Sequence, residues 1–137
     1  MSDQPIARAV FAARLVQARQ LRGLSQRALG DRMGLGKDKG SSRINRYEHQ
    51  VTAIGFDNLD RLAQVLDVPV AYLLADDAAM ADAILALSQA DESQRNALAM
   101  LIPALVQDPP LLASLVKLLE VPKHKRPEAL RDLAQKV

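Results

Sequence analysis

A run of polar side chains occupies residues 41–48, and its residue types are those that hydrogen-bond to the edges of nucleic-acid bases. If the run is helical, Ile44 and Tyr47 lie about one turn apart and face a core. The face left free then carries Ser42, Arg43, Asn45 and Arg46. Arginine can bond O6 and N7 of guanine, asparagine can bond adenine in the same bidentate way, and serine can donate to a base or a phosphate. The run therefore predicts a base-recognition surface; the alternative is an ordinary solvated helix face.

The charge distribution favours contact with a polyanion in the same part of the chain. The 137 residues carry a formal net charge of +2. The first 50 residues contain 10 basic and 4 acidic side chains, residues 76–120 contain 2 and 7, and residues 121–137 contain 5 and 2. The positive field of the N-terminal part therefore lies mostly ahead of Thr52, although solvated helix faces would carry the same charges.

Composition argues against most other chemistries. The chain has no Cys, which excludes disulfides, thiolate metal sites and a Cys nucleophile, and it has only two His, His49 and His124. No nucleophile with a base and no carboxylate pair has a suitable spacing, and the glycines Gly34 and Gly36 are too few for a phosphate-binding fingerprint. We therefore expect no enzyme activity, no metal and no cofactor.

The sequence also predicts that the protein is cytoplasmic and does not enter a membrane. Its longest apolar run, residues 97–106, includes Pro103 and has half of the roughly 20 residues that a spanning helix needs. The N-terminal residues Met-Ser-Asp-Gln-Pro lack the basic segment and apolar stretch of a secretory signal.

The elements that must position the polar run are helices, because apolar residues recur with a period near 3.6 rather than 2. The fold class that follows is all-α. Gly23 and Gly34 should end the first two helices, and residues 34–40 should form a glycine-rich loop. Asp57 should cap the fourth helix, with Phe56 ahead of it as a hydrophobic staple. Five helices are expected before residue 76: 7–21, 25–33, one from about 41, one from 57 through Leu66, and a short one after Pro69.

The composition changes after residue 76, because all four aromatic residues lie before it and the rest is rich in Leu and Ala. Two domains are therefore predicted, 1–76 and 77–137. The C-terminal helices carry more apolar surface than a short tail needs, so they are expected to form a homodimer; the alternative is that they fold back as extra core. They are placed at 78–89, 92–107, 111–120 and 127–136.

The sequence predicts five short helices, of which the second and third are joined across a glycine-containing turn, and the polar third helix lies in a basic half of the chain. This is the arrangement of a helix-turn-helix DNA-binding unit. The details add to this: Arg-Gln-Leu-Arg-Gly-Leu-Ser-Gln at residues 19–26, Ala28-Leu29, Met33-Gly34, Ile44 to Glu48, and Leu59 to Leu74. Over residues 9–75 the chain resembles the Cro/C1-type (XRE) helix-turn-helix family of phage repressors and bacterial regulators. The resemblance implies a five-helix, lambda-repressor-like DNA-binding domain.

The resemblance also implies roles for individual residues. Gln26, at the start of the second helix, would contact a phosphate, while Ser41, Ser42 and Arg46 would face base edges. Arg46 is the main candidate for direct base recognition. The DNA-binding candidates together are Gln26, Arg27, Lys37, Lys39, Ser41, Ser42, Arg43, Asn45 and Arg46.

Arg19 and Glu48 match two family positions that form an ion pair between the first helix and the end of the third. A partly buried pair of this kind fixes the orientation of a helix more than it adds net stability. We therefore assign Arg19 and Glu48 a structural role.

The sequence departs from the family pattern between Gly34 and Ile44, which are separated by about four residues more than the tight turn needs. The insert carries Lys37 and Lys39. These lysines could contact phosphates beside the groove, or the insert could be an idle surface loop. The start of the third helix, and with it the position of Ser41, is less well fixed than that of Arg46.

These observations predict a sequence-specific transcriptional regulator that binds double-stranded DNA, acting as a repressor on a palindromic operator as a homodimer. The alternative is an antitoxin or adaptor whose C-terminal helices bind another protein, with DNA binding secondary. Neither interpretation needs a cofactor.

Overall fold

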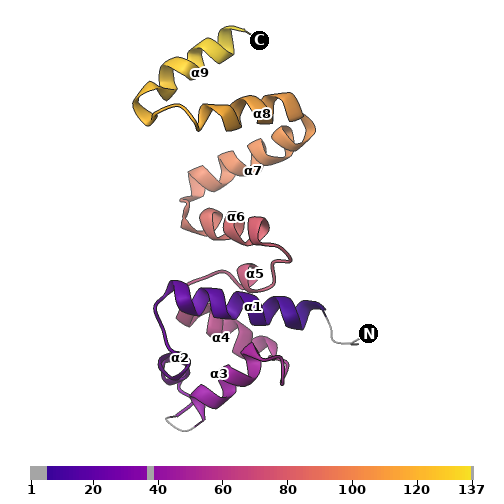
Figure 1. Cartoon of the computed structure of the whole chain (residues 1–137), viewed down its shortest axis with the longest axis vertical. Coiled ribbons are helices and arrows are strands. Elements are labelled where there is room, and N and C mark those ends of the chain that lie inside the picture. Colours follow the sequence, from indigo (N-terminus) through magenta and orange to yellow (C-terminus); the bar gives the residue numbers. More distant parts are fainter. Residues whose placement is uncertain (1–5, 37–38, 137) are drawn as a thin grey trace. The chain divides into compact units, whose positions relative to one another are not determined.

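The computed structural model of the protein describes residues 6–36 and 39–136. All regular secondary structure in these residues is helical, which confirms the predicted all-α fold class. The elements, labelled in Figure 1, are α1 (Ile6–Leu21), α2 (Gln26–Arg32), α3 (Gly40–Glu48), α4 (Phe56–Leu66), α5 (Val70–Leu73), α6 (Ala78–Gln89), α7 (Glu92–Gln107), α8 (Pro109–Leu118), the 3₁₀ turn η1 (Lys123–Lys125) and α9 (Arg126–Gln135).

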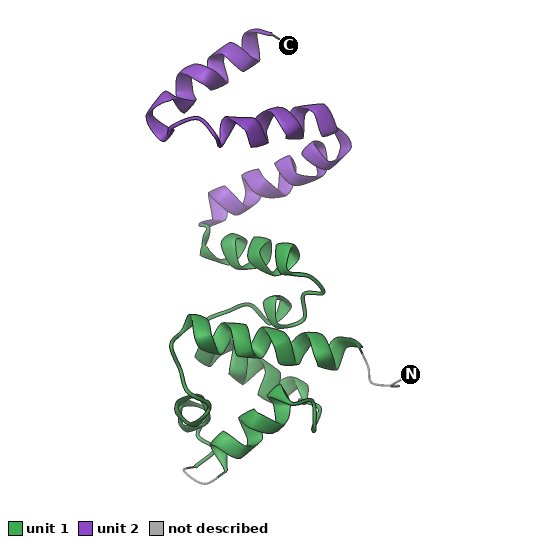
Figure 2. Cartoon of the chain, viewed as in Figure 1, with its two compact units in different colours: residues 1–90 green, residues 91–137 purple. Residues whose placement is uncertain are grey.

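The chain forms two compact units, residues 1–90 and residues 91–137 (Figure 2). Helix α6 belongs to the first unit, where it packs on α5 and buries Ala81 to 1% exposure. Ile84 and Leu85 also pack against the core of that unit. The change of composition at residue 76 therefore does not coincide with the edge of the compact unit, because the Ala- and Leu-rich α6 continues the first core. The division into functional domains at residues 76 and 77 stays a prediction.

The core of the first unit takes at least one fully buried aliphatic side chain from each of the helices α1 to α5. Burying one such side chain contributes about 1.5–3 kcal/mol. Phe11 and Tyr47 add an edge-to-face ring contact with centroids 6.2 Å apart. The fully buried side chains are Leu15, Leu29, Ile44, Leu62, Leu66 and Leu73.

Helix ends in the first unit follow from local residues, with one exception. Gly23 and Gly34 adopt positive φ angles after α1 and α2, and the Ser25 hydroxyl accepts a 2.9 Å hydrogen bond from the Ala28 amide. The exception is α4: Gly55 occupies its N-cap in extended conformation, so Asp57 lies inside the first turn. The prediction that Asp57 caps this helix is therefore wrong, and Phe56, 86% exposed, forms no buried staple.

The backbones of α2 and α3 approach so closely that no side chain fits between them at one point. A Cβ on Gly30 would lie 2.5 Å from Cα and C of Gly40, and a Cβ on Gly40 would lie 2.8 Å from Cα of Gly30. This contact sets the position of α3 on α2 despite the long connection between them. Glycine at both positions is therefore a packing requirement.

The second unit has well-formed helix ends but no buried core. The Asp91 carboxylate and the Gln94 side chain form a capping box at the start of α7, and the Arg126 guanidinium donates to the carbonyls of Leu119 and Val121 after α8. None of its described residues is buried. Its exposed large apolar side chains are Leu98, Met100, Leu101, Ile102, Val106, Leu111, Leu112, Val116, Leu119 and Leu130.

Within the described residues, no single helix has the length and apolar character of a membrane span; α7 and α8 meet those criteria only as a pair, and the chain bends by 119° between them.

Candidate nucleic-acid interface

The exposed face of α3 lies opposite the residues that anchor it in the core. Gly40, Ile44 and Tyr47 are buried, which fixes the rotation of α3 about its own axis. At 3.6 residues per turn, the positions opposite this face are those of Ser42, Asn45 and Arg46, and all three are exposed. Ser41 and Arg43 lie to either side of them, with Ser41 only half-exposed.

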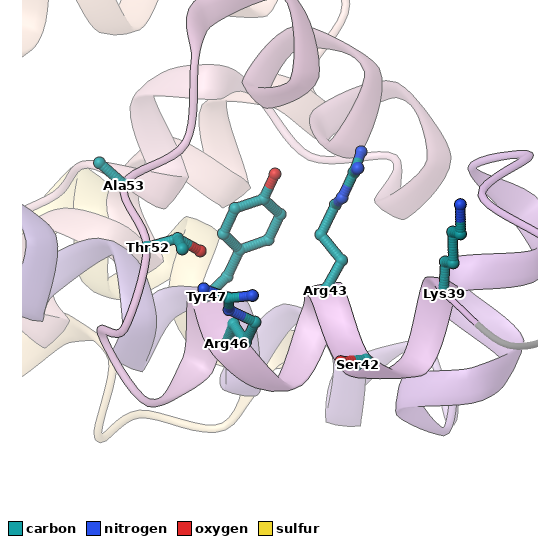
Figure 3. A pocket seen from close by; sticks show the side chains of 7 residues that line it. All are labelled: Lys39, Ser42, Arg43, Arg46, Tyr47, Thr52 and Ala53. Carbon is teal, nitrogen blue, oxygen red and sulfur yellow. The ribbon is translucent and has the colours of Figure 1, made fainter.

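An open cleft of about 410 Å³ runs along one side of α3 (Figure 3). Three of the residues that line it are cationic and are spaced three and four residues apart, so they follow one side of the helix. In Figure 3 the side chains of Lys39, Arg43 and Tyr47 leave the ribbon in the same direction. The lining residues are Lys39, Ser42, Arg43, Arg46, Tyr47, Thr52 and Ala53.

The cleft concentrates positive charge that nothing in the described chain neutralises. No ion pair joins Lys39, Arg43 or Arg46 to any described carboxylate. Unpaired cations beside hydroxyl groups form a surface that suits phosphate oxygens, whose counterions they would displace. Thr52 and Ala53, from the loop after α3, line the cleft at the end near Tyr47 and Arg46, away from Lys39 (Figure 3).

On the other side of α3, four side chains form a continuous hydrogen-bonded network. Arg19 Nε lies 2.6 Å from Glu48 Oε1, so the ion pair expected between these two residues is present. The side chain of Glu48 is only 4% exposed. The Gln26 amide nitrogen donates to Glu48 Oε2 at 2.6 Å, and the Asn45 amide nitrogen lies 3.4 Å from the Gln26 oxygen. The network therefore joins α1, the start of α2 and the exposed face of α3.

The structure places most of the predicted DNA-binding residues on or beside α3. Lys39, Ser42, Arg43 and Arg46 line the cleft, Asn45 and Gln26 belong to the network, and Arg27 is exposed on α2. Lys37 lies outside the described residues.

Sequence reasoning missed Thr52, which comes beside α3 only because the chain reverses after that helix. Gln50 makes the reversal with a φ of 61°, a left-handed conformation. No local signal marks this turn, because Gln is not among the residue types that favour a left-handed conformation. Near it, His49 Nδ1 lies 2.9 Å from the Asn45 carbonyl, which fits a capping role. No three potential metal ligands lie together in the part of the chain that the structure describes.

These features define a helix-turn-helix DNA-binding domain, and comparison with known proteins gives the family. The family model described as Helix-turn-helix matches residues 15–73. The crystal structure of the transcriptional regulator BswR is 32% identical, with a TM-score of 0.65; the match covers 70% of this chain and 95% of that one. None of the curated protein sequences matches this one. The chain belongs to the Cro/C1-type (XRE) helix-turn-helix family.

Family and fold together support a DNA-binding transcriptional regulator rather than an enzyme.

Proposed function

We propose that this protein is a sequence-specific transcriptional repressor that binds an inverted-repeat operator in the cytoplasm as a homodimer. The observation that carries the proposal is the exposed face of α3, where cations without a described ion-pair partner and the Asn45 amide lie opposite the buried Gly40, Ile44 and Tyr47. A helix held in this way can enter the major groove without reorganising the domain.

The exposed face of α3 and the cleft beside it suit different parts of a duplex. Arg46 lies near the centre of the exposed face, where its guanidinium can bond O6 and N7 of guanine. Arg43, Lys39 and Thr52 lie at the edge of the cleft, where phosphates of one strand would pass. Ser42 is exposed and also lines the cleft, so its hydroxyl can donate to a base or to a phosphate.

The second unit supports the homodimer. Residues 97–106 of α7 are apolar on every side of the helix, and helices of that kind are normally surrounded by protein. The unit itself supplies α8 as the neighbour of α7 and leaves Met100 and Val106 70% or more exposed. A second copy presenting the same surface would cover them, and a two-fold pair of α3 helices fits an operator with half-sites about 10 bp apart.

Selection from randomised double-stranded DNA with the whole protein tests the proposal directly. We expect an inverted-repeat sequence, with affinity that falls steeply as salt rises. Arg46→Ala should cost about 1–3 kcal/mol on that sequence and relax one base preference in each half-site. Arg131→Ala, which removes the same charge from an exposed position in the second unit, is the matched control and should keep every base preference.

An adaptor or antitoxin is the second candidate, because the apolar surface of the second unit could equally cover another protein. The mass of the purified protein in solution separates the two: a dimer without any partner supports the homodimer. A monomer that binds DNA weakly would instead support the adaptor.

A further inference from the structure

The direction of each hydrogen bond in the network beside α3 is fixed, because the Glu48 carboxylate can only accept hydrogen bonds. The Glu48 carboxylate is held by Arg19 and is almost fully buried, so the Gln26 amide must turn its NH₂ group toward it. The 2.6 Å distance is typical of a strong, charge-assisted bond. The orientation of the Gln26 side chain is therefore fixed by its bond to Glu48, without any contact to DNA.

This orientation carries over to the next side chain. With its NH₂ group on Glu48, Gln26 presents its oxygen toward α3, and that oxygen lies 3.4 Å from the amide nitrogen of Asn45. The bond is long, yet an acceptor at that place favours the Asn45 amide with its NH₂ group toward Gln26. The Asn45 oxygen and the second N–H of the same NH₂ group are then left for the solvent side of α3, where Asn45 is exposed.

We propose that Asn45 is a specificity-determining residue for adenine and that Gln26 is the residue that positions it. A carboxamide that offers one acceptor and one donor outward matches N6–H and N7 of adenine in the major groove. The inference rests on the proposed DNA-binding function and deepens it, because it assigns one base preference to one side chain.

Gln26 thereby acts differently from a plain phosphate contact. Both its oxygen and its NH₂ group have partners in the protein, Asn45 and Glu48. A residue that only binds phosphate changes affinity for all sequences by the same factor, whereas a positioning residue changes preference at one base pair. This difference can be measured.

The experiment is a binding-site selection with four full-length proteins: wild type, Asn45→Ala, Gln26→Met and Arg27→Ala. Asn45→Ala should lower the preference for adenine at one position of each half-site by roughly tenfold or more. Gln26→Met should lower the preference at the same position by about threefold or more, because the freed Asn45 amide can flip. Arg27→Ala, next to Gln26 and exposed on α2, is the control and should weaken all sequences alike.

Two further variants keep the test decisive. Asn45→Asp offers acceptors only and should change the preferred base at that position from adenine to cytosine. If Gln26→Met fails to fold, as judged by circular dichroism, Gln26→Ala replaces it. The double variant Gln26→Met with Asn45→Ala should lose no more preference at that position than Asn45→Ala alone, since the two act through one contact.

The inference is overturned if Gln26→Met weakens all sequences by one factor, or if Asn45→Ala leaves every base preference unchanged. A wild-type selection that enriches no sequence would contradict the proposed function itself. The two failures are therefore distinguishable in the same experiment.

Discussion

The two units of this protein use their apolar residues in opposite ways. In the first unit, leucines such as Leu15 and Leu62 are fully buried, and even a cation, Arg14, is 7% exposed with its guanidinium bonded to Gln17 and the Ala75 carbonyl. In the second unit none of the described residues is buried. Apolar content alone therefore does not tell whether a segment forms its own core. What decides this is how the apolar residues are distributed around each helix.

The reason lies in how many faces of each helix are apolar. The α4 helix confines Leu59, Leu62 and Leu66 to one stripe, which one packed core can cover. The apolar residues of α7 run consecutively around the helix and would need neighbours on several sides. The first unit therefore buries its own apolar stripes, whereas the second leaves apolar side chains exposed, which the proposed second copy would cover.

Removal of the second unit is the strongest test of this contrast. A chain that ends at Ala90 keeps α6 and should stay folded, but it should be monomeric. Its affinity for the full operator should fall by about 100-fold or more, because the second half-site is no longer tethered. Analytical ultracentrifugation and a DNA titration measure both effects.

The same truncation has a built-in control, which is binding to a single half-site. That affinity should match the affinity of the whole protein for one half-site. If the shortened chain remains dimeric and binds the full operator tightly, the dimer contact lies in the first unit and the second unit serves another partner.

Gly30→Ala should destabilise the first unit alone. The new methyl would meet the backbone of Gly40 at 2.5 Å, which neither helix can relieve by a side-chain movement. We expect a loss of about 2–3 kcal/mol in the free energy of unfolding of that unit, with the association of the second unit unchanged. Chemical denaturation followed by circular dichroism gives the first quantity, and sedimentation gives the second.

Gly55→Ala is the matched control for this substitution. Nothing lies within 4 Å of a Cβ there, and the φ angle is −80°. Its stability should change by less than about 1 kcal/mol. An equal loss from both variants would mean that the close contact of α2 and α3 is not what Gly30 provides.

Features encoded within one helix or one turn could be predicted from the sequence. The stripe of Leu15 and Ala18 in α1, the Ser25 cap and the glycine ends of α1 and α2 all depend on residues a few positions apart. The Arg19 and Glu48 pair is a long-range contact, and the family resemblance supplied it. The placement of Arg46 followed from the buried positions of Ile44 and Tyr47.

Features that depend on packing between distant segments could not be predicted. Thr52 joins the cleft because of a reversal at Gln50, and Gly30 meets Gly40 across a connection of unusual length. The N-cap of α4 is Gly55 in extended conformation, so the helix starts two residues earlier than it would with Asp57 as the cap. In each case the local sequence is compatible with more than one backbone conformation, and contacts between distant segments decide which one forms.

Lys39→Ala tests whether DNA binding depends on the first unit and not on the second. If Lys39 neutralises one phosphate in each half-site contact, the slope of log K against log salt should decrease by about 0.9 per lost contact. The mass of the dimer and the preferred sequence should not change. Lys136→Ala removes the same charge from the end of the second unit, and an equal change in slope from that variant would assign the effect of Lys39 to overall charge.

Gln50→Gly should produce the smallest effect, and it is a gain. Gln50 holds a φ of 61°, which costs a residue with a Cβ about 1 kcal/mol relative to glycine. Glycine also loses more backbone entropy on folding, so we expect a net stabilisation of the first unit by somewhat less than about 1 kcal/mol. Thermal unfolding of the chain ending at Ala90 measures this without interference from dimer dissociation. The reversal at Gln50 also brings Thr52 to the cleft, so the DNA affinity of this variant is informative. Unchanged affinity would show that only the backbone conformation at position 50 matters for DNA binding. A loss of affinity would show that the Gln50 side chain makes a contact of its own.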